Sequence, residues 1–156
     1  MITTALRISK LLPRGRVYQF VQRAFSANLD EVKFQDLSDN EFDRISEETL
    51  QGLCEYFDEL PEKVSTSSDY DVSYSMGVLT VALGQPGTYV INKQSPNKQI
   101  WLSSPVSGPQ RYDYVTNHKW FYKRLGLSLH ELLEKEMSQI FGQETLNLKK
   151  LEEKSS

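Results

Sequence analysis

Cysteine and histidine are scarce in this chain of 156 residues, which contains one cysteine, Cys54, and two histidines, His118 and His130. A single cysteine can form neither an intramolecular disulfide nor a thiolate zinc site, and we expect Cys54 to act as a small hydrophobic residue. No HExxH, CxxC, GxSxG or phosphate-loop motif occurs, and we interpret His130 as structural and His118 as solvated. Chemistry that depends on such motifs is therefore not expected.

Long apolar runs are also missing, because no stretch of about eighteen apolar residues occurs and no transmembrane helix is expected. The length suits one domain with a single core, plus tails. Charge is abundant but uneven, since residues 30–71 hold fourteen acidic residues against three basic ones. Without residues 1–25 the chain has 13 basic and 21 acidic residues, so it should repel nucleic acid and attract cations.

The first 25 residues have the opposite composition, with five basic residues and no acidic one. A basic, acid-free segment with interspersed Leu and Val is typical of a mitochondrial transit peptide. The Arg23-Ala24-Phe25-Ser26 sequence resembles a matrix-processing site, with cleavage after Phe25 or close by. The alternative is a disordered basic arm that binds anions. We predict a flexible segment over residues 26–37.

The acidic segment carries a helical pattern. Ser38 followed by Glu41 forms a capping box, which predicts a helix that begins at Asp39, and Pro61 favours its end. Apolar side chains, with one threonine among them, recur at spacings of three and four: Phe42, Ile45, Thr49, Leu53, Phe57 and Leu60. Carboxylates occupy most of the remaining positions, so one side of this helix should be strongly acidic.

Short alternating segments follow between residues 69 and 122, with a loop expected over 105–109, and they predict consecutive antiparallel strands. A second capping box, Ser128 with Glu131, opens another helix that ends near Gly142. The order helix, strands, helix predicts an α+β fold over residues 38–142. This fold is a two-layer sandwich in which two helices pack on one face of an antiparallel sheet of five to seven strands. Leucines in the C-terminal tail, residues 143–156, should pack on the helices.

A hairpin of two strands is the most informative part of the pattern. Alternation over residues 90–94 and 99–103, with Ser-Pro-Asn between them, predicts that Asn92, Gln94, Gln99 and Trp101 share one sheet face. A large indole among amides suits a docking surface. The alternative is a tryptophan folded onto its own sheet.

Carboxylates without histidine or cysteine favour hard cations that bind through oxygen, such as iron, manganese, magnesium or calcium. The candidate groups on the helix and on the first strand could cluster if that strand starts beside the helix: Asp43, Glu47, Glu48, Glu55, Asp58, Glu59, Glu62, Asp69 and Asp71. The alternative is a solvated acidic face without a bound metal.

Two further stretches, TYVINKQSPNKQIWLSSP over 88–105 and SGPQRYDY over 107–114, resemble the frataxin family, and the resemblance extends over roughly residues 38–148. It implies an acidic ridge that binds iron weakly, at the matching positions Glu47, Glu48, Glu55, Asp58, Glu59, Asp69 and Asp71. Gln51 interrupts the run at a position where many relatives carry an acid. The resemblance also implies a partner-binding sheet face at Asn92, Gln94, Gln99, Trp101 and Arg111.

The function implied by this resemblance is that of a mitochondrial matrix protein in iron–sulfur cluster assembly. Such a protein binds the complex of cysteine desulfurase and scaffold protein and accelerates sulfur transfer. The alternatives are a ferroxidase or iron-storage protein, and an iron chaperone for ferrochelatase, and so for haem synthesis, or for aconitase. No Glu-x-x-His pair of the di-iron type supports the enzyme. We expect a monomer that iron can drive into oligomers, with neither nucleic acid nor membrane as a partner.

Overall fold

The computed structural model describes residues 32–142 and 146–154. The predicted transit peptide and residues 26–31 therefore lie outside the described residues. Within these limits, no helix combines the length and the apolar character needed to cross a bilayer.

The first described helix, α3 (Asp39–Glu59), begins where its sequence predicts. The Ser38 hydroxyl accepts a hydrogen bond from the Glu41 N–H, and the Glu41 carboxylate accepts one from the Ser38 N–H, so the capping box is complete. Every residue of the predicted apolar stripe is buried, together with Leu50 and Ser46. The helix passes directly into a 3-10 turn, η1 (Leu60–Glu62), which contains Pro61.

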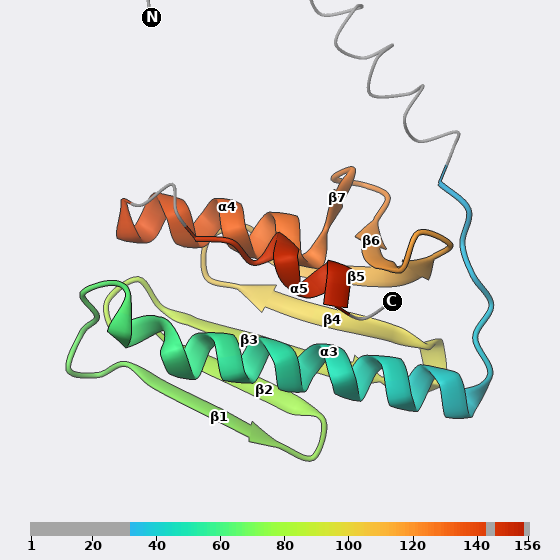
Figure 1. The fold of residues 1–156 in the computed structure, drawn as a ribbon, viewed down its shortest axis with the longest axis horizontal. Helices are drawn as coiled ribbons and strands as arrows, with labels where there is room; N and C mark the ends of the chain where they lie inside the picture. The colour runs from blue at the N-terminus through green and yellow to red at the C-terminus, as the bar shows by residue number, and fades with distance from the viewer. Residues whose placement is uncertain (1–31, 143–145, 155–156) are drawn as a thin grey trace, which may run out of the picture. The chain divides into compact units, whose positions relative to one another are not determined.

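Seven strands form one antiparallel sheet in sequential order: β1 (Asp71–Ser75), β2 (Val78–Ala82), β3 (Thr88–Gln94), β4 (Gln99–Ser104), β5 (Gly108–Val115), β6 (Lys119–Tyr122) and β7 (Leu127–Ser128). A 3-10 turn, η2 (Ser95–Asn97), connects β3 to β4. Figure 1 shows α3 and α4 (Leu129–Phe141) lying over the same face of this sheet. The predicted α+β sandwich is confirmed, with the largest number of strands in the expected range.

The core lies between the sheet and these helices. Alternate residues of the strands, including Tyr89, Ile91, Ile100 and Tyr112, are fully buried and belong to one hydrophobic cluster with the inner faces of α3 and α4. Because side chains alternate along a strand, the residues between them point to the opposite face of the sheet. The same register that builds the core therefore also determines which polar residues face away from it.

Part of the segment predicted to be flexible contacts the sheet in residues 34–37: the Gln35 N–H donates to the Tyr114 carbonyl at 3.0 Å, and Leu37 is buried. On its β4 side, β5 has a strand partner only as far as Tyr112, because β4 begins at Gln99. The N-terminal segment pairs with the free edge of β5 beyond that point, through the bridge between Phe34 and Val115. The expected loop over 105–109 is shorter, since Gly108 and Pro109 belong to β5. Pro109 is tolerated because β6 pairs only with residues 113–115, so no neighbour on that side needs its N–H.

The C-terminal tail packs as expected over residues 146–154. Leu146 and Leu148 are buried in the main core, and α5 (Lys149–Lys154) lies between α3 and α4 (Figure 1). A buried carboxylate, Glu152, secures this helix through the Lys119 ammonium at 3.1 Å, and its second oxygen lies 3.3 Å from Nδ1 of the buried His130 ring. His130 is therefore structural, as predicted, and His118 is exposed in the β5–β6 turn.

Candidate functional site

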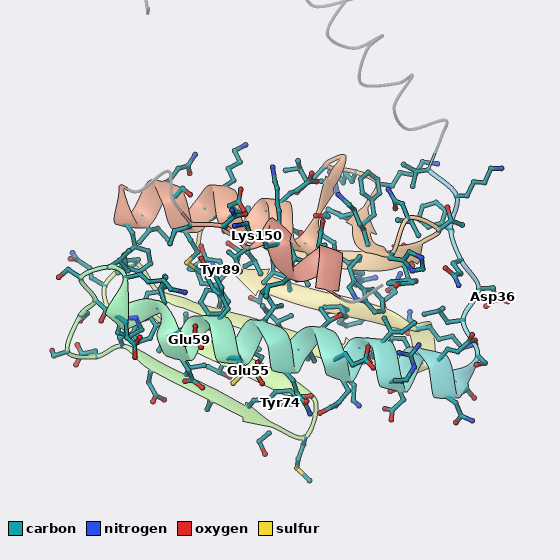
Figure 2. All side chains as sticks on the ribbon, viewed as in Figure 1. Asp36, Glu55, Glu59, Tyr74, Tyr89 and Lys150 are labelled. Atoms are coloured by element: carbon teal, nitrogen blue, oxygen red, sulfur yellow. The ribbon has the colours of Figure 1, made fainter. Side chains whose placement is uncertain are left out.

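The first candidate surface is an acidic ridge, defined as eight carboxylates on α3 and at the start of β1: Asp43, Glu47, Glu48, Glu55, Asp58, Glu59, Asp69 and Asp71. All are exposed except Glu47, which is half-buried. Tyr70 brings the two elements together, because its hydroxyl donates to the Phe57 carbonyl at 2.6 Å and so holds the start of β1 beside the end of α3. Figure 2 shows Glu55 and Glu59 on α3, with Tyr74 of β1 nearby.

Several ridge carboxylates have partners within the chain. Glu48 pairs with Arg44 at 3.0 Å within α3, and Glu59 at the end of α3 pairs with Lys63, just after η1, at 3.6 Å. Such exposed pairs contribute little to stability and leave the oxygens accessible. The Cys54 thiol donates weakly to Asp58, and burial together with this carboxylate raises the pKa of the thiol, which favours its neutral form.

Lys93 was not anticipated as part of this surface. Its ammonium donates to Asp43 at 2.6 Å and to Glu47 at 3.0 Å, from β3 to the middle of α3. The pKa of Glu47 is lowered, first by the Tyr74 hydroxyl beside it and then by Lys93, while the hydrogen bond to Asp43 raises the pKa of Lys93. A signal was present in the sequence, because alternation along β3 places Lys93 on the helix side, opposite Asn92 and Gln94.

The expectation that the first strand starts beside the helix holds, but the carboxylates do not form a compact cage. Among the residues that the structure describes, no group of three or more Asp, Glu, His or Cys side chains could enclose a metal ion. A cation on this ridge would therefore contact one or two carboxylates and keep several waters, as hard divalent ions commonly do.

The second candidate surface is the open sheet face, defined by Asn92, Gln94, Gln99, Trp101 and Arg111. The register confirms that they share one face, since Asn92 pairs with Trp101, Trp101 with Arg111, and Gln94 with Gln99. The three described helices do not cover this face, because they pack on the other one (Figure 1).

Trp101 is held in place rather than fully exposed. Its indole N–H donates to the Gln99 side chain at 2.9 Å, and the Arg111 guanidinium lies 4.5 Å from the ring centroid. Gln99 in turn donates to Asp113 at 2.8 Å. Asp113 was missed by sequence reasoning, although its spacing of two from Arg111 places it on the same face. The indole is thus already oriented in the free chain, and an oriented side chain loses less entropy on binding than a mobile one.

These features define a two-layer α+β domain that presents a row of carboxylates on α3 and an oriented indole on the open sheet face. A family model described as Frataxin-like domain matches residues 35–143, and the chain belongs to the frataxin family. It is 48% identical over 134 residues to the mitochondrial frataxin homologue of Drosophila melanogaster, covering 83% of this chain and 70% of the relative. It is 45% identical over 129 residues to the mitochondrial frataxin of Caenorhabditis elegans, covering 82% and 90%.

Solved structures agree with this assignment. A trimeric frataxin from the yeast Saccharomyces cerevisiae, described as complexed with ferrous iron, superposes with a TM-score of 0.56 at 35% identity and covers 70% of this chain and 90% of its own. The relatives named here are mitochondrial proteins, and the expected mitochondrial location is thereby confirmed. The transit peptide itself remains a prediction.

Proposed function

We propose that this protein binds iron weakly through the acidic ridge and activates iron–sulfur cluster assembly. In this proposal it docks on a complex of cysteine desulfurase and scaffold protein and accelerates the transfer of sulfur to the scaffold. Membership of the frataxin family and the ferrous complex of the yeast relative support an iron-related role.

The observation that carries the docking part is the open sheet face. A face without helices carries Trp101 and Arg111 in contact, surrounded by amide side chains and little aliphatic surface. Tryptophan and arginine are the residues that most often dominate the energy of a protein interface. The acidic ridge lies on other elements, so a partner with a basic patch could contact the ridge while the scaffold contacts Trp101.

The test is a reconstituted assembly reaction that contains cysteine desulfurase with its accessory subunits, scaffold protein, cysteine and ferrous iron, with this protein at an equimolar ratio. The rate of cluster formation on the scaffold is measured. We expect stimulation by the wild-type chain and loss of most of it in Trp101→Ala, because an anchor on a sheet face matters more for binding than for the core.

Ser103→Ala is the matched control, since Ser103 is an exposed residue of the same strand and the same face. It should stimulate like the wild type. Thermal unfolding of both variants checks their folding. A Trp101→Ala variant that unfolds would place the indole in the core, and one that stimulates normally would remove it from the interface. Oxygen consumption by the isolated protein with ferrous iron, without stimulation of assembly, would instead support a ferroxidase.

A further inference from the structure

We infer that Lys93 and Gln51 withdraw the Asp43–Glu47 end of the acidic ridge from iron binding and confine the iron to its other end, near Glu55 and Asp58. This inference rests on the proposed binding of iron by the ridge, and it concerns which carboxylates are available to the metal.

Both oxygens of the Glu47 carboxylate already have donors from the chain itself. Oε2 accepts from the Lys93 ammonium at 3.0 Å, and Oε1 accepts from the Gln51 amide at 3.0 Å. The Tyr74 hydroxyl lies beside the same carboxylate and lowers its pKa. Gln51 interrupts the acidic run of α3 and donates to Glu47. An acidic residue at this position would instead add a third negative charge beside Asp43 and Glu47.

The Lys93 ammonium occupies the place that a bound cation would take. It lies 2.6 Å from Asp43 and 3.0 Å from Glu47, between two carboxylates one helical turn apart. A divalent ion ligated by the same oxygens would sit about 2.0–2.6 Å from them, and so against the ammonium. Repulsion between the two cations at such a distance is strong, and the Lys93 side chain, at 19% exposed, is screened less by solvent than the Asp43 side chain, which is 69% exposed.

The position of Lys93 is built into the fold rather than adopted by a mobile surface lysine. The side chain crosses the β1–β2 turn, where Gly77 has a φ of +75°. A Cβ at Gly77 would lie 2.8 Å from Cγ of Lys93, so only glycine leaves room for this stem. The Lys93 N–H also donates to the Gly77 carbonyl at 3.0 Å. Turn, strand and helix together therefore hold the ammonium at Asp43 and Glu47.

The other end of the ridge differs. Glu55 has no partner among the interactions found in the described part of the chain, and Asp58 accepts only a weak contact from the Cys54 thiol at 3.7 Å. Tyr70 ties the start of β1 to Phe57 at this end, but Asp71 pairs with Ala82 and its side chain therefore points to the open face of the sheet, away from α3. The carboxylates at this end of α3 are exposed. Among them only Glu59 has a basic partner in the described part of the chain, Lys63.

The test is anaerobic titration of the full-length chain with ferrous iron by calorimetry, using two matched double variants. Asp43→Asn/Glu47→Gln and Glu55→Gln/Asp58→Asn each remove two charges from α3. We expect the first to change the apparent affinity by less than about twofold and the second to weaken it by about tenfold. Equal weakening by the two double variants would overturn the inference.

A gain-of-binding variant tests Lys93 directly. Lys93→Met keeps the aliphatic stem and removes the ammonium, so it should tighten iron binding or add a binding event. Combination with Asp43→Asn/Glu47→Gln should abolish that gain. Paramagnetic broadening by Mn²⁺ of the backbone amides around Glu47, relative to those around Glu55, should increase when Lys93 is replaced. If Lys93→Met folds poorly by circular dichroism, Lys93→Gln replaces it.

Failure of the proposed function is distinguishable from failure of this inference. If the wild-type chain binds no iron, the proposed iron binding is wrong and so is the confinement of iron to the Glu55–Asp58 end, but the Lys93 variant still decides whether Lys93 keeps cations away from Asp43 and Glu47. A gain that requires Asp43 and Glu47 supports it in that case, and the absence of any gain overturns it.

Discussion

Leu148 offers the sharpest test of how the C-terminal tail contributes to the fold. Its side chain is fully buried in the main hydrophobic cluster, one residue before α5. Leu148→Ala removes buried methyl and methylene groups and leaves a cavity, which typically costs about 2–5 kcal/mol. That loss is a large share of the roughly 5–15 kcal/mol that stabilises an ordinary domain.

The corresponding thermal shift can be estimated. For a domain of about 120 residues, 1 kcal/mol lowers the unfolding midpoint by roughly 3–5 °C, so we expect a decrease of about 6–25 °C. Circular dichroism melts and urea titrations of the full chain measure the effect. Lys150→Ala is the control, because Lys150 is an exposed residue of α5 (Figure 2) and surface changes usually stay within about 0.5 kcal/mol.

Leu148 lies on the helix side of the sheet, whereas Trp101 points to the other face. Stimulation of cluster assembly per folded molecule should therefore be unchanged in Leu148→Ala. A midpoint shift as small as that of Lys150→Ala would refute the reasoning, because it would mean that the tail contributes no packing energy.

Two further predictions concern charge. The pKa of Glu152 is lowered: burial alone would raise it, but hydrogen bonds and charges from His130, Ser128 and Lys119 more than offset burial. A lowered pKa in the folded state stabilises the protein above the ordinary value of 4.5, and this contribution is lost as the pH falls below it. Urea titrations should thus show a deficit in Glu152→Gln at pH 7 that shrinks below about pH 4.5; a constant deficit would contradict the assignment. Replacing Glu55, Asp58 and Glu59 together by lysine should weaken desulfurase binding at low salt. The effect should be smaller at high salt, because salt screens both the attraction of the wild-type carboxylates and the repulsion of the lysines that replace them. Unaffected binding at low salt would leave the ridge with a role in solubility alone.

Local patterns in the sequence predicted the elements well because their causes are local. A capping box uses residues three positions apart, so Ser38 and Glu41 were enough to place the start of α3. Turn residues acted similarly, since Met76 and Gly77 both adopt a positive φ between β1 and β2. Alternation along β3 and β4 predicted the open sheet face, because a hairpin with a short connection leaves few possible registers.

The contacts between distant segments could not be predicted in this way. Lys93 reaches Asp43 across fifty positions of sequence, and the Trp120 indole donates to Thr49 across seventy-one. Thr49 fitted the apolar stripe, but only the packed structure shows that its hydroxyl serves a buried indole. The pairing of residues 34–35 with β5 likewise depends on where β4 begins.

The sequence by itself thus determined the two long helices, the strands up to residue 122, the polar composition of the sheet face and the acidity of α3, because periodicity and capping act over a few residues. Tertiary structure alone decided which carboxylates are neutralised. That outcome depends on how β3 is positioned along α3, which places Lys93 next to Asp43 and Glu47. It also depends on Gly77, which leaves room for the Lys93 side chain at the β1–β2 turn. Such distances are set by the packing of layers, which no local pattern encodes.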